Sequence, residues 1–318
     1  MSLERRIALV GLALVLAGCP SRSARDDLLD GGATDARNTD GALTDARNSD
    51  ARPIDAGSPD AAGTPCDLLT HHINADSECV ANLCDGSTTT RILFIGNSYT
   101  AANTLANLVR ELAMAEGCPV EVDSSLIGGA RFSTHAQNAT TLAKIAVGGW
   151  DFVVLQNQSQ VPGWRPADVL SGSVPHAESL ATAIASASPA AQIVYFQTWG
   201  RRDGDAGNCG YYPLVCTFDG HTQALAEGYA QYAAATGGDI APVGTAWKVV
   251  VDSTSPPFPS ADLWSGDGSH PALRGSYLAA AVFFGRIFKG SPVGNPYSAG
   301  LSVVDAAFLQ DVAAPFGQ

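Results

Sequence analysis

Positive charge is scarce in this sequence. Its 318 residues include 18 Lys and Arg against 31 Asp and Glu, which gives a net charge of −13. No stripe of basic residues interrupts this acidic composition. Because the phosphates of a nucleic acid attract basic surfaces and repel acidic ones, we expect no nucleic acid among the partners of this protein.

Metal-binding motifs are also missing. None of the seven cysteines forms a Cys-x-x-Cys pair, a spacing typical of structural zinc sites. His71 and His72 lie in a Cys-rich segment and have the character of surface residues rather than ligands. The sequence therefore predicts no metal site.

The N-terminal apolar run is too short to span a membrane as a helix. It extends from Ile7 to Leu16 and follows Arg5 and Arg6, whereas a transmembrane helix needs about 20 residues. This layout is typical of an export signal. The sequence Leu-Ala-Gly-Cys that ends at Cys19 resembles the bacterial lipobox, and an ordinary secretory signal with a chance cysteine is the alternative.

The lipobox resemblance implies a lipid anchor on Cys19 and a signal peptide over residues 1–19. We therefore expect the protein in the cell envelope, anchored by lipid to a bacterial membrane, the outer membrane, on its periplasmic or its surface side. The membrane would then be a partner through the lipid alone.

Residues 20–65 are rich in Asp, Ala, Gly, Thr, Asn and Ser and contain hardly any aliphatic cluster. Aspartates recur at every fifth position, at Asp30, Asp35, Asp40, Asp45, Asp50, Asp55 and Asp60. A period of five matches neither a helix nor a strand, so no face can be buried, and we expect a disordered tether. A calcium-binding repeat is the alternative, but the spacing differs from that of known calcium loops.

Six cysteines remain after Cys19, an even number that favours disulfides in an exported chain. Cys209 and Cys216 flank a short loop and form the easiest local pair. The other four allow three connectivities, which the sequence leaves open: Cys66, Cys79, Cys84 and Cys118. The first three of these four belong to a lead-in segment at residues 66–87.

Residues 88–318 alternate apolar runs with helical patterns. Strands are expected at Ile92–Ile95, Val120–Val122, Phe152–Leu155, Ile193–Phe196 and Ile240–Val243. Helices are expected at Thr104–Ala115, His176–Ser186, Thr222–Ala234 and Leu273–Phe288. This alternation predicts an α/β domain with a parallel sheet covered on both faces, and active sites of such sheets lie at the carboxyl ends of the strands.

Two distant segments carry residues of a nucleophilic triad. Ser98 follows the first predicted strand in Gly96-Asn97-Ser98, and Asp267 lies three residues before His270 near the C-terminus. A carboxylate at this spacing can fold back onto Nδ1 of the imidazole, which leaves Nε2 free to take a proton from a hydroxyl.

These two segments resemble the first and last sequence blocks of the SGNH (GDSL-type) hydrolase superfamily. The resemblance covers about residues 88–318, and Asp267-Gly-Ser-His270-Pro271 is the more specific block. It implies a flavodoxin-like, three-layer α/β/α fold with a five-stranded parallel sheet. It also implies acyl-ester hydrolysis with Ser98 as nucleophile, His270 as base and Asp267 as its orienting acid, without metal or organic cofactor.

The same resemblance implies an oxyanion hole. One donor is the Ser98 backbone N–H, and a second is expected at Gly129 or Gly128 after the second strand. The third is an Asn side chain after the third strand, where the family's usual Gly-x-Asn-Asp is absent and this chain has Gln156 and Asn157. We expect Asn157, or alternatively Gln156, to supply it.

Three tryptophans follow late strands or precede the acid, and their rings could stack on a sugar. They are Trp199, Trp247 and Trp264. With the expected compartment, they favour an acylated carbohydrate or another small ester as the substrate. The alternatives are a lipase or lysophospholipase, or a surface-binding lipoprotein that has lost catalysis.

Overall fold

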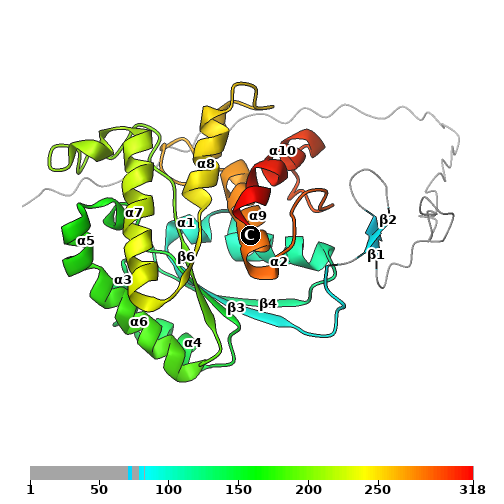
Figure 1. The fold of residues 1–318 in the computed structure, drawn as a ribbon, viewed down its shortest axis with the longest axis horizontal. Coiled ribbons are helices and arrows are strands. Elements are labelled where there is room, and N and C mark those ends of the chain that lie inside the picture. Colours follow the sequence, from blue (N-terminus) through cyan, green and yellow to red (C-terminus); the bar gives the residue numbers. More distant parts are fainter. Residues whose placement is uncertain (1–70, 74–78, 82, 318) are drawn as a thin grey trace, which may run out of the picture. The chain divides into compact units, whose positions relative to one another are not determined.

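The computed structural model describes residues 71–73, 79–81 and 83–317 (Figure 1). The predicted signal peptide with Cys19, the predicted tether at residues 20–65 and Cys66 lie outside the described residues. Within the lead-in, β1 (His71–Ile73) pairs with β2 (Cys79–Ala81) as an antiparallel hairpin. Among the described helices, none combines the length and the apolar composition that crossing a membrane requires.

A five-stranded parallel sheet forms the centre of the domain. Its strands are β3 (Thr90–Gly96), β4 (Val120–Leu126), β5 (Phe152–Leu155), β6 (Gln192–Phe196) and β7 (Asp239–Ala241). Their order in the sheet is β4-β3-β5-β6-β7, and all neighbouring pairs are parallel. This is the flavodoxin-like order 2-1-3-4-5, as predicted.

The strand order fixes where a site can form. The chain leaves β3 toward β4 on one side and then returns to β5 on the other side, so a crevice opens at the carboxyl ends of β3 and β5. Gly96 ends β3 opposite Leu126 of β4, and Ile95 lies opposite Leu155 of β5. Ser98 follows Gly96 by two residues and therefore lies at this crevice.

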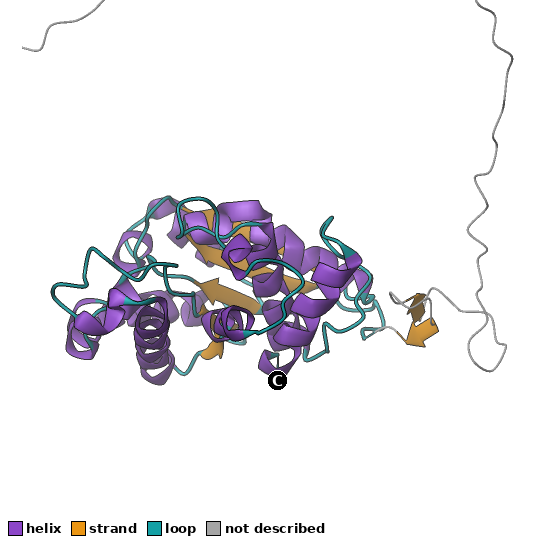
Figure 2. Cartoon of the chain, turned by 90° about the horizontal axis from the view of Figure 1, so that it is seen from above, coloured by secondary structure: helices purple, strands orange, loops and turns teal. Residues whose placement is uncertain are grey.

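Helices cover both faces of the sheet (Figure 2). One face packs against α2 (Leu105–Ala115), α8 (Val243–Asp252), α9 (Leu273–Phe288) and α10 (Val303–Ala313). The other packs against α3 (Phe132–His135), α4 (Ala139–Ala146), α5 (Pro166–Gly172), α6 (Val174–Ala187) and α7 (Phe218–Thr236). In Figure 1 the second group gathers on the left and most of the first group on the right.

Side-chain alternation along β3 explains the two cores. Ile92 and Phe94 point into one hydrophobic cluster, and Leu93 and Ile95 point into the other. Successive side chains of a strand face opposite sides, so a strand buried on both faces has a continuous apolar sequence. All four side chains are fully buried.

Short helices complete the loops. They are α1 (Ser98–Ala101), η1 (Ala102–Thr104), η2 (Val161–Gly163), η3 (Pro213–Cys216), η4 (Ser260–Leu263) and η5 (Ala314–Phe316). The sequence predicted none of these, nor α3, α4, α5, α8 and α10. It also extended the last strand to Val243, whereas β7 ends at Ala241 because Pro242 has no N–H to continue the ladder and α8 begins at Val243.

Two disulfides are described. Cys209 and Cys216 are joined, as the local spacing predicted, and brace the loop after β6. Cys84 is joined to Cys118, a pair that belongs to one of the three connectivities that the sequence left open. This second bond fastens the segment before β3 to the turn after α2.

A buried histidine makes the stability of the fold depend on pH. His221 of α7 is fully buried, and its Nδ1 accepts a hydrogen bond from the Arg201 backbone N–H. Burial lowers its pKa to about 4 because desolvation penalises the imidazolium; the Asp205 charge opposes this shift and the Arg201 charge adds to it. The pKa of the buried His135 is lowered as well, chiefly by desolvation.

We predict that the free energy of unfolding falls as the pH drops from 6.5 to 4. In this window the unfolded chain binds a proton at His221 and the folded chain does not, which accounts for about 3 kcal/mol. The lowered pKa of His135 acts in the same direction. Urea unfolding as a function of pH measures the effect, and His221→Asn should flatten it. His176→Asn, which alters a half-buried histidine of α6, is the control. An equal pH slope in His221→Asn and the parent would contradict the prediction.

Candidate active site

The turn after β3 places Ser98 at the edge of the sheet. Asn97 caps α1: its side-chain Oδ1 accepts from the Tyr99 N–H at 3.1 Å, and its backbone carbonyl accepts from Thr100 and Ala101. The Ser98 N–H donates to no group of the described residues. It is therefore free to bind a substrate atom.

Gly96 is required by close packing. A Cβ at this position would lie 2.5 Å from Thr100 Oγ1 and 2.8 Å from Gln156 Oε1. Its carbonyl accepts from the Ile127 N–H at 3.0 Å, and His135 Nε2 lies 3.0 Å from the same oxygen. The strand end is thus fixed on both sides before the chain reaches Ser98.

The second half of the site is the loop Ser265–Pro271 between η4 and α9. The Ser265 N–H donates to the His270 carbonyl at 2.8 Å, and the Gly268 N–H donates to the Ser265 carbonyl at 3.0 Å. Gly268 has a φ of +67°, a left-handed conformation that favours glycine. This tight turn brings Asp267 back to face His270.

Four hydrogen bonds hold the Asp267 carboxylate. Oδ1 accepts at 2.9 Å from the Ser265 hydroxyl and from the backbone N–H groups of Ser269 and His270, and Oδ2 lies 2.6 Å from His270 Nδ1. Partial burial acts to raise the pKa of Asp267, but the bonds from His270, Ser269 and Ser265 outweigh it and hold the pKa well below its usual value. Asp267 is therefore ionised near neutral pH.

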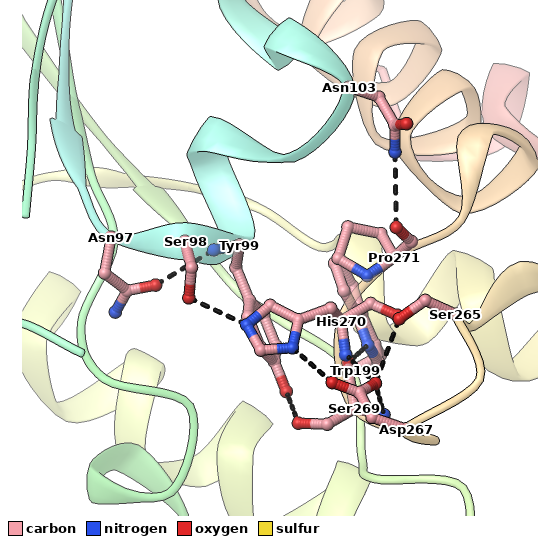
Figure 3. A network of polar contacts seen from close by, with 10 residues as sticks. All are labelled: Asn97, Ser98, Tyr99, Asn103, Trp199, Ser265, Asp267, Ser269, His270 and Pro271. Carbon is pink, nitrogen blue, oxygen red and sulfur yellow. Dashed lines mark hydrogen bonds and ion pairs between the residues drawn. The ribbon is translucent and has the colours of Figure 1, made fainter. Parts of the chain in front are cut away.

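Ser98, His270 and Asp267 form a continuous chain of hydrogen bonds (Figure 3). Ser98 Oγ lies 2.8 Å from His270 Nε2. Because the ionised Asp267 can only accept, it fixes the proton of the imidazole on Nδ1, so Nε2 is the acceptor for the Ser98 hydroxyl. The three residues that the sequence singled out are thus brought together over a separation of 172 residues.

Two side chains connect the segment that begins with α1 to the loop Ser265–Pro271, which we call the histidine loop (Figure 3). The Tyr99 hydroxyl lies 2.6 Å from Ser269 Oγ, and its ring packs edge-on against His270 at a centroid distance of 5.2 Å. Asn103 Nδ2 donates to the Pro271 carbonyl at 3.2 Å and to Ser276 Oγ at 2.9 Å. The distance between Ser98 and His270 therefore depends on these contacts.

Asn103 makes these contacts from a strained backbone. Its φ is 51°, and the next residue, Thr104, has a φ of 53°. Asn tolerates this left-handed region better than most residues, and a strained conformation next to a reactive group commonly has a functional reason. Here the conformation aims the Asn103 amide at the histidine loop.

The predicted oxyanion residues Gly128 and Gly129 lie in the turn after β4, which is bonded to the end of β3. The turn Ile127–Ala130 is closed by the Ala130 N–H, which donates to the Ile127 carbonyl at 3.0 Å, and Gly129 in this turn has a φ of +65°. The N–H groups of Gly128 and Gly129 donate to none of the residues that the structure describes, and both glycines are exposed. Like the Ser98 N–H, they are backbone donors without a partner in the described part of the chain.

Asn157 does not lie in the open site, in contrast to the prediction. It is fully buried, and its Nδ2 donates at 2.9 Å to both Ser173 Oγ and the Tyr232 hydroxyl. Its Oδ1 accepts from the N–H groups of Phe132 and Gln158. Both amide protons are used within the protein, so Asn157 holds the loop that follows Gly129 rather than donating to a substrate.

Gln156 is likewise part of the scaffold. It is fully buried, its Oε1 accepts from the Asn97 N–H at 2.9 Å and from Thr100 Oγ1 at 3.0 Å, and its Nε2 donates to the Asn157 carbonyl. Asn97 Nδ2 in turn donates to the carbonyls of Ala130 and Asn157. The predicted donor role thus has no support in the contacts of either amide.

The predicted sugar contacts of the three tryptophans do not hold. Trp199, Trp247 and Trp264 are 1%, 0% and 5% exposed. Trp199 stacks between Tyr99 and Trp247, at centroid distances of 5.0 and 3.8 Å, and Trp264 packs against Trp247. The three rings are therefore packed inside the protein next to Tyr99, where a sugar cannot reach them.

Sequence reasoning missed the residues that position the triad: Tyr99, Asn103, His135, Ser265 and Ser269. Three of them had a local signal, because Tyr99 adjoins the nucleophile and both Ser265 and Ser269 lie two residues from Asp267. Asn103 and His135 had none, since their partners lie far along the chain. In the part of the chain that the structure describes, no three His, Cys, Asp or Glu side chains form a group that could hold a metal ion.

Comparison with solved structures places this geometry in a family. A protein from Slackia heliotrinireducens that is assigned to the SGNH hydrolases is 32% identical, with 62% of this chain and 98% of that chain covered and a TM-score of 0.49. A DUF4886 family protein from Bacteroides uniformis is 22% identical and shares the fold, with 72% and 94% covered and a TM-score of 0.61. Neither a family model nor a curated protein sequence matches the chain.

The sequence identity to the Slackia protein extends over nearly the whole of that chain. The chain therefore belongs to the SGNH (GDSL-type) hydrolase superfamily, as its two sequence blocks indicated.

We predict that Gly96→Ala lowers the free energy of unfolding by about 1–3 kcal/mol, the usual cost of inserting a methyl group into a packed position. The new Cβ would press on Thr100 and Gln156, whose oxygens are held in place by their mutual hydrogen bond. Urea unfolding measures the change. Gly210→Ala is the matched control because nothing lies within 4 Å of its Cβ position, and an equal effect in both variants would contradict the prediction.

Proposed function

We propose that this protein is a serine esterase that hydrolyses carboxylic, acyl or acetyl, esters of carbohydrate or another small extracytoplasmic compound. The observation that carries the proposal is the hydrogen-bond chain from Ser98 through His270 to Asp267, with lengths of 2.8 and 2.6 Å, beside free backbone donors. The proposed setting is the cell envelope, with the chain anchored through lipid on Cys19. This setting rests on the sequence alone.

The reaction begins with proton transfer. His270 Nε2 takes the proton of the Ser98 hydroxyl as Oγ attacks the ester carbonyl, and the ionised Asp267 stabilises the imidazolium. The negative charge that develops on the carbonyl oxygen is received by the N–H groups of Ser98 and Gly129. Such donors are effective because they are oriented before the reaction, and losing one typically costs about 10²–10³ in turnover.

His270 then passes its proton to the departing alcohol, which leaves an acyl group on Ser98. A water molecule, deprotonated by the same nitrogen, attacks the acyl group and releases the acid. Water reaches the site easily because the side chains of His270 and Asp267 are 40% and 49% exposed. Every step of the proposed reaction uses residues of this chain.

A lipase is less well supported. A lipase would need a broad aliphatic surface beside Ser98. Among the described residues, the exposed large aliphatic side chains lie on helices or at the other end of the sheet, and none is in a loop that follows a sheet strand. The intact triad geometry likewise favours an enzyme over a binding protein that has lost catalysis.

We predict that Ser98→Ala lowers kcat for 4-nitrophenyl acetate by about 10⁴-fold or more, as for other serine triads. The control is Ser186→Ala, which removes a hydroxyl that donates to the Thr182 carbonyl on α6. A fluorophosphonate should label the parent and Ser186→Ala at Ser98 and leave Ser98→Ala unlabelled. Undiminished hydrolysis by folded Ser98→Ala would refute the mechanism.

A second prediction concerns Asn103 as a positioning residue. Asn103→Gly keeps the left-handed backbone and removes the contacts to Pro271 and Ser276, so kcat should fall by about two- to tenfold while KM stays constant. Thr104→Gly is the matched control, because its hydroxyl donates only to the neighbouring Asn103 carbonyl. Equal kinetics of the two variants would mean that these contacts do not set the triad geometry.

A further inference from the structure

Two arginines near the candidate site have no acidic partner among the residues that the structure describes. Arg131 follows Gly129 by two residues, and Arg165 begins the segment before α5; both are exposed. The other arginines of the described chain all lie within 4.0 Å of a carboxylate: Arg91, Arg110, Arg201, Arg202, Arg274 and Arg286. In a chain with a net charge of −13, two unpaired cations on one side of the site call for an explanation.

Each of these guanidinium groups rests on an aromatic ring. Arg131 Cζ lies 5.3 Å from the ring centroid of Trp164, and Arg165 Cζ lies 3.8 Å from that of Tyr211. Trp164 and Arg165 are consecutive residues, so the two stacked pairs are adjacent along the chain. We call Arg131, Trp164, Arg165 and Tyr211 the cation–aromatic strip.

The strip begins at the candidate oxyanion loop. The Ala130 carbonyl, directly before Arg131, accepts from Asn97 Nδ2 at 3.1 Å, and Asn97 adjoins Ser98. The Phe132 N–H, directly after Arg131, donates to Asn157 Oδ1 at 3.1 Å. Arg131 is therefore fixed at both neighbours to the scaffold that holds the nucleophile.

The outer end of the strip is also held in place. Tyr211 lies in the loop closed by the Cys209–Cys216 disulfide, and Arg165 donates to the Tyr211 carbonyl. The Tyr211 hydroxyl donates to Asp168 at 3.2 Å, which is the acidic group that contacts the strip. Asp168 lies beyond salt-bridge distance of Arg165, so the charge of the guanidinium is not neutralised by it.

Arginines held in this way suit an anionic ligand. Stacking on a ring fixes the planar guanidinium and leaves donors free, so that less conformational entropy is lost when a carboxylate binds to its fork. An exposed ring beside a cation also provides an apolar face for a sugar. Arg201 and Arg202 are less suitable, because Asp205 and Asp203 already pair with them.

We propose that the cation–aromatic strip recognises the carboxylates of an acidic saccharide whose ester is cleaved at Ser98. This inference rests on the proposed esterase function and specifies its substrate class. The substrate would be an acylated oligomer of uronic acids: the ester enters the site beside Gly129, and sugar units beyond it extend along Arg131 and Arg165.

The test compares an acidic with a neutral substrate on the full-length protein. Substrates are an acetylated oligomer of galacturonic acid and an acetylated oligomer of xylose. We expect the ratio of their kcat/KM values to favour the acidic oligomer and to fall by about tenfold or more in R131Q/R165Q, because a hydrogen bond to a charged group is usually worth that factor. Added salt should lower the ratio in the parent and have little effect in the double variant.

The control variant is Arg110→Gln, which removes the same charge from a pair with Glu111 on α2 and should keep the parental ratio. Binding of the unacetylated galacturonic acid oligomer, measured by calorimetry, tests the strip without catalysis and should weaken by about the same factor in R131Q/R165Q.

The outcomes separate the two proposals. Suppose that the parent and R131Q/R165Q both hydrolyse 4-nitrophenyl acetate and show the same ratio of kcat/KM values for the acidic and the neutral oligomer. Recognition by the cation–aromatic strip would then be refuted, and the esterase proposal would stand. If no ester is hydrolysed but the acidic oligomer binds through Arg131 and Arg165, the esterase proposal fails and the recognition of acidic saccharides stands. If the unacetylated galacturonic acid oligomer binds equally well to the parent and to R131Q/R165Q, recognition by the cation–aromatic strip is refuted in either case.

Discussion

The candidate site depends on a cluster of buried amides at the end of β5. Gln156 holds the turn of the nucleophile through the Asn97 N–H and Thr100, and Asn157 holds the loop after Gly129 through the Phe132 N–H. The cluster thus joins the two backbone segments that carry the free donors. A buried amide left without partners costs about 1–3 kcal/mol, so these two segments are strongly favoured in one relative position.

This arrangement accounts for the departure from the family's usual third sequence block. An amide that donated to substrate would have to be exposed, and the amides after β5 instead have their donors within the protein. In the proposed mechanism, the N–H groups of Ser98 and Gly129 receive the negative charge instead. Their positions are set by Gln156 and Asn157, so the polar residues after β5 contribute to the chemistry by orienting peptide groups.

The sequence predicted those features that depend on local pattern. Apolar runs marked all five strands of the sheet, and the Asp-x-x-His spacing marked the acid and base because three residues suffice to form their turn. The sequence could not predict which polar or aromatic residues become buried. Asn157 is covered by Ser173 and Tyr232, and Trp199 is covered by Tyr99 and Trp247, partners that only the folded chain brings together.

The distribution of charge indicates how such an open site could still be selective. The triad is accessible to solvent, and among the described residues no large aliphatic side chain in the loops after the strands is strongly exposed, so apolar burial would add little to substrate affinity. Selectivity must then come from directed polar contacts at the rim. On an acidic protein, the carboxylates of the chain itself attract an unpaired arginine. The stacking of Arg131 on Trp164 and of Arg165 on Tyr211 holds the two guanidinium groups away from such intramolecular ion pairs. The aromatic rings therefore keep two cations available beside a reactive serine, where neutral ligands would gain little and acidic ones would gain most.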